Sequence, residues 1–164
     1  MRQNNNTITF MVYQVLDKDT ISIEILPHLS VAKRGFQTTS CVLEVVNSIL
    51  YKLKTVCQWH MLPVKSLFSN VVLSHKTVFG HFRKWCKNGE WEYCWTKTLE
   101  KYKSFLDLSS ADLDGSHTTA LRGDEQVAYQ GRKKRKTTNS LYLSDRQGLP
   151  LALSSPTAGN QNDL

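Results

Sequence analysis

The stretch Leu108-Ser109-Ser110-Ala111-Asp112-Leu113-Asp114-Gly115-Ser116-His117 decides how the second half of this chain is organised. Apolar and polar residues alternate up to Asp114, as in a β-strand, and small residues follow. The pattern predicts a strand over residues 106–114 that delivers the Asp114 carboxylate to a turn. A carboxylate fixed at a strand end is typical of the acidic sets that hold Mg²⁺ for phosphoryl transfer, although an Asp in a turn is also an ordinary turn residue.

Asp112 and His117, two neighbours of Asp114, are weaker candidates for a role in the same metal-binding or DNA-contacting site. Asp112 precedes it by two residues and therefore shares its strand face, where a second carboxylate can assist. His117 is a candidate for a DNA contact or for supporting a metal ligand, and otherwise an ordinary surface histidine. No second acidic residue in a comparable setting follows before Leu164, so we expect the front part of a phosphoryl-transfer nuclease.

Composition favours a polyanionic partner. The 164 residues carry a formal net charge of +7, and 40% are hydrophobic, which is enough for a folded core. Nucleic acid is the first expectation and an anionic membrane surface the second. The polar N-terminus and the lack of a long apolar run predict a cytoplasmic protein without a membrane span. The cysteines match no zinc motif, and we expect them to be reduced and mostly in the core: Cys41, Cys57, Cys86 and Cys94.

Residues 17–104 are expected to form a helical region, after a leader of residues 1–16 that no pattern assigns. Asp17 offers a cap for a short helical element that Pro27 ends. Helical spacing of apolar residues predicts three longer helices, over residues 40–54, about 75–88, and 90–104. Residues 63–73 between the first two are expected to be a loop. Aromatic residues on the last two helices predict a core: Phe79, Phe82, Trp85, Trp91 and Trp95.

Residues 105–164 are expected to contain a small antiparallel sheet, which makes the fold class α+β. Three strands are predicted over residues 106–114, 137–143 and 149–153. The segment Ser144–Gly148 has the Asp and Gly of a tight hairpin. A three-stranded sheet with no covering helix is a weak folding unit, so we expect the helical region to be the more stable one.

Two basic clusters are candidates for contact with DNA. Arg83, Lys84 and Lys87 face outward on their helix, as in the recognition helix of a helix-turn-helix, or as on any solvated helix face. The run Gly131-Arg132-Lys133-Lys134-Arg135-Lys136 places five positive charges in six residues just before a strand. At a hairpin end it can neutralise several phosphates, and it also resembles a nuclear localisation signal or a solvated loop.

Two motif stretches follow one another in the helical region. The first is Glu44-Val45-Val46-Asn47-Ser48-Ile49-Leu50-Tyr51-Lys52-Leu53-Lys54-Thr55-Val56-Cys57-Gln58-Trp59-His60-Met61-Leu62-Pro63. The second is Thr77-Val78-Phe79-Gly80-His81-Phe82-Arg83-Lys84-Trp85, followed by Gly89-Glu90-Trp91-Glu92. Both look like the N-terminal signature of a known family, the bacterial insertion-sequence transposases of the insertion-sequence-five group. The position of Asp114 matches the first Asp of the family's Asp-Asp-Glu triad. The resemblance covers about residues 17–164.

The resemblance implies a helix-turn-helix-like DNA-binding region in residues 17–104. In residues 105–164 it implies the truncated start of a ribonuclease H-like catalytic domain. The implied chemistry is Mg²⁺-dependent hydrolysis at transposon ends, then attack of the freed 3′-hydroxyl on target DNA. Asp114 would be the catalytic metal ligand of this chain, since the family's second Asp and Glu lie on later elements. The implied partners are double-stranded DNA and either the downstream transposase portion or a second copy, at the bacterial nucleoid and without a membrane.

Two positions depart from the family pattern. Val56 stands where Gly is usual between Thr and Cys, so we expect a turn there that needs positive φ. Gln161 stands where a His often precedes the terminal Asn-Asp pair.

Three functions are therefore in view. The first is a transposase fragment or upstream frame product that binds DNA and lacks cleavage activity alone. The alternative is a stand-alone DNA-binding regulator or inhibitor of transposition. A membrane-surface protein ranks last, because the charges do not gather on one amphipathic surface helix.

Overall fold

The chain folds into two compact units. The computed structural model describes residues 13–31, 41–120 and 126–159. Within them the fold is α+β, as predicted, and one unit reaches to Thr98 while the second begins at Leu99. The boundary falls inside the last long helix, α5.

The first unit is helical and contains the three longer helices that the sequence predicts. Its elements are α1 (Lys18–Thr20), η1 (Ile21–Ile25), η2 (Leu26–His28), α2 (Val42–Thr55), η3 (Trp59–Met61), α3 (Val64–Leu67), α4 (His75–Lys87) and the greater part of α5 (Glu90–Lys101). The short helix α3 lies where a loop was predicted. It escapes detection because four residues are too few to show a helical period. Two further sequence signals, Ser40 as a candidate capping residue for α2 and a basic turn at residues 33–35, lie outside the described residues.

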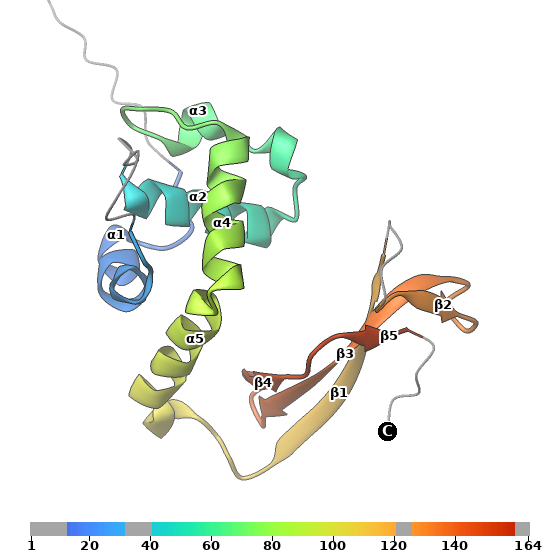
Figure 1. The fold of residues 1–164 in the computed structure, drawn as a ribbon. Helices are drawn as coiled ribbons and strands as arrows, with labels where there is room; N and C mark the ends of the chain where they lie inside the picture. The colour runs from blue at the N-terminus through green and yellow to red at the C-terminus, as the bar shows by residue number, and fades with distance from the viewer. Residues whose placement is uncertain (1–12, 32–40, 121–125, 160–164) are drawn as a thin grey trace, which may run out of the picture. The chain divides into compact units, whose positions relative to one another are not determined.

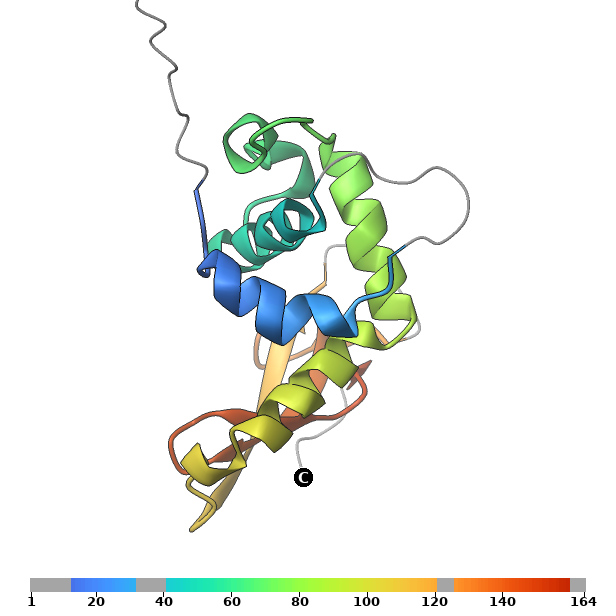
Figure 2. The ribbon, with the colours of Figure 1, turned by 90° about the vertical axis from the view of Figure 1, so that its left-hand side faces the viewer.

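The first helical segment begins at Asp17, as predicted. The Asp17 carboxylate accepts hydrogen bonds from the Thr20 amide at 2.8 Å and from the Thr20 hydroxyl at 2.6 Å. The first of these bonds satisfies a backbone amide that the first turn of a helix leaves free. Elements α1, η1 and η2 then follow without a break (blue in Figure 2).

The core of the helical unit is built on the apolar stripe of α2. Val45, Val46 and Ile49 are fully buried. This face packs against η1, α3 and α4 (Figure 1). Full burial of a side chain of this size stabilises the fold by about 1.5–3 kcal/mol. The core also includes Ile21, Leu29, Leu62, Leu67, Phe68, Val78 and Trp85.

One polar residue on the same helix ties down the start of the described chain. The Asn47 side chain is 1% exposed; it accepts a bond from the Val15 amide at 2.9 Å and donates one to the Tyr13 carbonyl at 2.6 Å. Both hydrogen bonds go to backbone atoms, so the buried amide is satisfied. Residues 13–15, which the sequence left in an unassigned leader, are therefore fixed to α2.

Helix α2 ends in a strained residue. Val56 follows Thr55 with φ 54° and ψ 16°, the left-handed conformation. The expectation of a positive φ at this position is thus confirmed. A β-branched residue adopts this conformation only against a steric penalty, and glycine has none.

The second unit is a sheet of five strands around β3. After η4 (Lys103–Phe105), the strands are β1 (Ala111–Thr119), β2 (Ala128–Gln130), β3 (Arg135–Asp145), β4 (Pro150–Leu153) and β5 (Thr157–Ala158). β3 pairs with all four other strands, each antiparallel. β1 runs along one edge of β3, and β2, β5 and β4 follow one another along the other edge. The prediction of three strands missed β2 and β5, whose three and two residues carry no readable alternation.

The first strand was predicted in the wrong place. It runs from residue 111 to 119, whereas residues 106–110 contain a turn and no strand. Gly115, Ser116 and His117 were expected to turn the chain, but they pair with Leu141, Ser140 and Asn139 of β3. Backbone pairing along a long neighbouring strand therefore overrides the weak β-propensity of these small residues.

The hairpin between β3 and β4 was predicted correctly and is held by a buried carboxylate. Asp145 is 1% exposed. Its side chain accepts bonds from the amides of Gln147 at 3.0 Å, Leu149 at 2.8 Å and Asp107 at 3.1 Å. Gly148 adopts φ 82° and closes the turn by donating its amide hydrogen to the Asp145 carbonyl. The carboxylate therefore fixes both the turn and the segment that precedes β1.

Candidate nucleic-acid interface

Helix α4 presents a basic face that contains no acidic residue. Its 13 residues include four cations, namely Lys76, Arg83, Lys84 and Lys87, and no Asp or Glu. All four are exposed, which confirms the predicted outward orientation. Lys76, Arg83 and Lys87 are spaced by seven and four residues, so they form one stripe along the helix. The stripe concentrates positive charge on one side of a rigid element.

The opposite side of α4 is anchored by Trp85. Its side chain is 1% exposed, and the indole Nε1 donates a hydrogen bond to the Ser30 carbonyl at 3.0 Å. The ring meets Trp91 edge-on, with 5.9 Å between the centroids. Burial and this hydrogen bond together fix how α4 is rotated about its own axis. The rotation decides which residues reach the surface.

Two aromatic residues that were expected in the core are exposed. Phe79 is 39% exposed and Trp95 is 38% exposed. Phe79 lies about 100° around the helix from the buried Val78, because each residue advances a helix by that angle. Its ring leans on Trp59, at 5.1 Å between centroids, and leaves the outer side free. Phe79 therefore adds an apolar surface beside the basic stripe.

The end of α4 is linked to the start of α5 by Glu90. Its carboxylate accepts bonds from the Ser30 amide and hydroxyl, at 2.6 and 2.7 Å, and from the Asn88 side chain at 2.8 Å. Burial alone would raise the pKa of Glu90, but these hydrogen bonds and nearby Lys84 lower it below its ordinary value. Part of the Lys84 charge is therefore offset inside the unit.

A histidine on α4 is kept neutral. Burial, assisted by the charge of Lys84, lowers the pKa of His81 below its ordinary value of 6.5. Its ring lies 5.3 Å from that of Trp85. The charge of α4 at neutral pH therefore comes from its lysines and its arginine.

A second basic surface lies in the sheet unit, at the turn between β2 and β3. Residues 131–134 form the turn, and Arg135 and Lys136 are the first residues of β3. All five cations of the predicted run are exposed: Arg132, Lys133, Lys134, Arg135 and Lys136. Lys134 has φ 50°, a conformation that turns of this kind usually assign to Gly or Asn. The turn thus presents charge at a position where a small residue would fit with less strain.

Asp114 lies in the middle of β1, where it pairs with Tyr142 of β3. It is exposed, and the prediction that it sits in a turn at a strand end is wrong. Asp112 is also exposed and shares its face, because side chains alternate along a strand. His117 lies on the opposite face, with its Nδ1 3.5 Å from the Thr137 hydroxyl. The structure therefore brings together Asp112 and Asp114 and separates them from His117.

These residues fit a two-metal site only in part. Such sites use several carboxylates to hold two ions about 4 Å apart. Within the residues that the structure describes, no three His, Cys, Asp or Glu side chains are grouped closely enough to hold a metal ion. Asp145 accepts only backbone amides and belongs to the hairpin, while Asp124 and Asp163 lie outside the described residues. No catalytic step follows from this arrangement.

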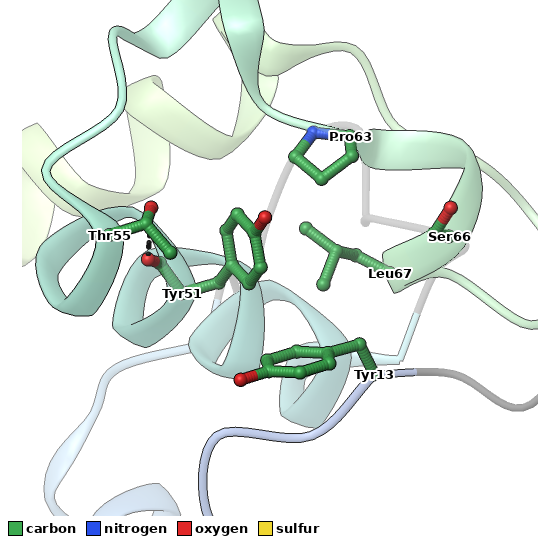
Figure 3. A pocket seen from close by; sticks show the side chains of 6 residues that line it. All are labelled: Tyr13, Tyr51, Thr55, Pro63, Ser66 and Leu67. Carbon is green, nitrogen blue, oxygen red and sulfur yellow. Dashed lines mark hydrogen bonds between the residues drawn. The ribbon is translucent and has the colours of Figure 1, made fainter.

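An open pocket of the helical unit was not foreseen. It measures about 340 Å³ and is lined by Tyr13, Tyr51, Thr55, Pro63, Ser66 and Leu67. The two tyrosine rings meet edge to face at 5.3 Å between centroids, with the Leu67 side chain beside them (Figure 3). Tyr13 lines this pocket because the hydrogen bonds of Asn47 hold residues 13–15 against α2. In the sequence, the polar Asn47 inside the apolar stripe of α2 was the signal that could have predicted this contact.

The cysteines are free among the described residues, as predicted, but are less buried than expected. Cys94 is buried, Cys57 is half-buried, and Cys41 and Cys86 are exposed. Cys41 precedes the first turn of α2, and Cys86 lies on the outer side of α4. Partial burial raises the pKa of the Cys86 and Cys94 thiols above the ordinary value. Neither is therefore an activated nucleophile.

One known protein family matches the helical region of this chain. Residues 23–95 match the family described as "Putative transposase of IS4/5 family (DUF4096)". The match supports a transposase-related role for this part of the chain. The matched residues include both motif stretches on which the resemblance rests, Glu44–Pro63 and Thr77–Glu92. Asp114 and the basic turn lie beyond the matched residues. No curated protein and no solved structure matches the chain.

None of the helices in the described ranges is long and apolar enough to cross a membrane.

Proposed function

We propose that the helical unit is the DNA-binding region of an insertion-sequence transposase and that α4 contacts double-stranded DNA. The observation that carries this proposal is the exposed basic face of α4, which holds four cations and no acid and is fixed to the core by Trp85. Lysine and arginine on such a face bind phosphates and release condensed counterions. The match of residues 23–95 to the IS4/5 transposase family supports this assignment.

The dimensions of α4 suit the major groove of DNA. A helix can enter this groove when one of its faces is free, and helix-turn-helix proteins use their second helix in this way. Phe79 beside the basic stripe offers an apolar contact for a thymine methyl group. The DNA substrates that we propose are transposon ends and target DNA, bound mainly through phosphates.

The turn between β2 and β3 is proposed as a second phosphate-binding surface. Its five exposed cations lie on a four-residue turn and on the first two residues of β3, and the sheet fixes their geometry. Contacts of this type add affinity without reading sequence.

Asp114 is proposed as the carboxylate that this chain contributes to the acidic site of a ribonuclease H-like domain. It projects from a paired strand with Asp112 on the same face, which suits a metal ligand. Mg²⁺ is the expected metal because carboxylate oxygens are its usual protein ligands. The described residues alone do not complete such a site, so DNA binding is the activity that we assign to them. The downstream transposase portion or a second copy of the chain is the proposed source of the remaining ligands.

A second candidate function is that of a stand-alone regulator that binds transposon DNA without cutting it. The basic face of α4 is complete within the described residues, whereas Asp114 is accompanied only by Asp112. Cleavage of transposon-end DNA by the chain with Mg²⁺, and its loss in Asp114→Asn, would exclude the regulator. Cleavage that survives Asp114→Asn would contradict the assignment of Asp114.

The test of DNA binding is the salt dependence of affinity for a mixed-sequence duplex. Each phosphate contact that is lost lowers the slope of log affinity against log salt by about 0.9. Replacing Arg83 and Lys87 with Ala should therefore lower the slope by about 1.8 if each contacts one phosphate. Lys84 is kept because its replacement would also disturb Glu90.

The matched control replaces Lys18 and Lys65, which are exposed lysines on α1 and α3, with Ala. This variant loses the same formal charge but keeps the face of α4. An equal fall in slope in both variants would show that net charge, and not α4, determines binding. An unchanged slope in Arg83→Ala/Lys87→Ala would move the DNA surface to the turn between β2 and β3.

A further inference from the structure

The basic face of α4 contains a glycine that the fold does not require. Gly80 lies four residues after Lys76 and three before Arg83, so it occupies the basic stripe itself. A Cβ atom built on Gly80 would meet nothing within 4 Å. The residue has no left-handed φ, unlike Gly89 and Gly148. Neither packing nor backbone conformation explains a glycine at this position.

The glycine also works against the helix that contains it. Apart from proline, glycine is the least favourable residue in a helix interior. Gly80 lies in the middle of α4, where any side chain would find open space. A position of this kind ordinarily tolerates alanine, lysine or glutamine, which would stabilise the helix.

We infer that Gly80 is the point of closest approach between α4 and the DNA duplex, and that its missing side chain lets the helix backbone enter the groove. This inference rests on the proposed function of α4. Glycine is used where backbone must come close to a ligand. With Lys76 one turn before it and Arg83 one turn after it, Gly80 is flanked by cations that can reach phosphates on either side of the contact. Gly80 would therefore determine affinity through shape and not through charge.

The inference predicts opposite changes in stability and affinity. Gly80→Ala should raise the melting temperature of the helical unit because alanine favours the helix. The same change should weaken binding to a mixed-sequence duplex of about 20 base pairs, two helical turns. Gly80→Gln, with a longer side chain, should weaken binding by about tenfold, the loss of one good groove contact. In both variants the salt slope should stay unchanged, because no charge is removed.

The matched control adds the same bulk on α5 instead of α4. Thr96 is exposed on that helix, and Thr96→Gln should leave duplex affinity unchanged. A second control measures binding to one strand of the duplex alone, which has no groove. The affinity of Gly80→Gln for this single strand should equal that of the parent chain.

The outcomes separate this inference from the proposed function. If Arg83→Ala/Lys87→Ala lowers the salt slope but Gly80→Gln binds the duplex as well as the parent, α4 binds DNA and the close approach at Gly80 is wrong. An equal loss on single-stranded DNA would also overturn it. If neither variant changes binding, the assignment of α4 itself fails.

Discussion

The two units of this protein differ in what they bury. The helical unit encloses aliphatic and aromatic side chains contributed by η1, α2, α3 and α4 and by the segments that connect them. In the described part of the sheet unit no hydrophobic residue is buried, and the buried side chains include Thr137, Asn139 and Asp145. Leu113, Tyr129 and Leu153 are more than half exposed. One unit is therefore stabilised mainly by the hydrophobic effect and the other mainly by backbone pairing and one carboxylate.

The difference bears on the functions proposed for the two units. A DNA-binding surface, as proposed for α4, needs a rigid support, and α4 has one in the core beneath Trp85. The sheet holds Asp114 on a strand but supplies little apolar burial of its own. Burial of apolar area dominates folding stability, so the sheet unit should open first. Four variants, ordered by expected effect, test the comparison.

The largest effect should come from Trp85→Ala. Truncating a fully buried tryptophan costs about 3–5 kcal/mol of unfolding free energy because it removes contacts and leaves a cavity. All four tryptophans lie in the helical unit, so chemical unfolding followed by tryptophan fluorescence reports that unit. Trp95→Ala is the control, since its ring is 38% exposed and its loss should cost far less. Equal costs would show that Trp85 does not anchor the core.

The second effect should be confined to the sheet. Asp145→Ala removes the acceptor of three backbone amides and should cost about 2–3 kcal/mol of local stability. Faster amide hydrogen exchange at Gln147, Leu149 and Asp107 would report it. Asp112→Asn, a change at an exposed position on β1, should leave these amides unaffected. Protection that survives Asp145→Ala would mean that the turn is held by its backbone alone.

The third variant should stabilise the protein. The left-handed conformation costs a non-glycine residue about 1–2 kcal/mol, and part of the gain from glycine is offset by backbone entropy. Val56 is 77% exposed, so Val56→Gly loses little burial and should raise the free energy of unfolding by about 0.5–1 kcal/mol. Val72→Gly, at an exposed site where Val has no positive φ, should bring no gain. A lower melting temperature in Val56→Gly would contradict the account of the strain.

The smallest effect concerns Glu90 and depends on pH. The pKa of the Glu90 carboxyl is lowered in the folded state. The stability that the ionised carboxylate contributes is therefore present above its unfolded pKa, near 4.5, and is lost as the pH falls through the folded pKa. Glu90→Gln should therefore lower stability at pH 7, by no more than about 1 kcal/mol for exposed hydrogen bonds, and this deficit should shrink as the pH falls below the unfolded pKa. A Glu90→Gln deficit that did not shrink as the pH fell would point to packing instead of charge.

The comparison also shows what the sequence could predict. Helices α2, α4 and α5 were found because apolar residues recur along them with the helical period, and the basic face of α4 follows from the same period. The start and end of β1 could not be predicted, since Gly115 and Ser116 have little β-propensity and are held by pairing with β3. The exposure of Phe79 and Trp95 could not be predicted either, because the volume left by neighbouring helices decides it. The vacant surroundings of Gly80 became visible only in three dimensions.

Native-state amide hydrogen exchange on the full chain tests the central comparison most directly. The account predicts the slowest exchange in α2 and α4, near the free energy of global unfolding of the helical unit. It predicts distinctly faster exchange across β1, β3 and β4, whose pairing is not backed by an apolar core. Equal protection of residues 42–55 and residues 135–153 would contradict the claim that the two units are stabilised by different forces.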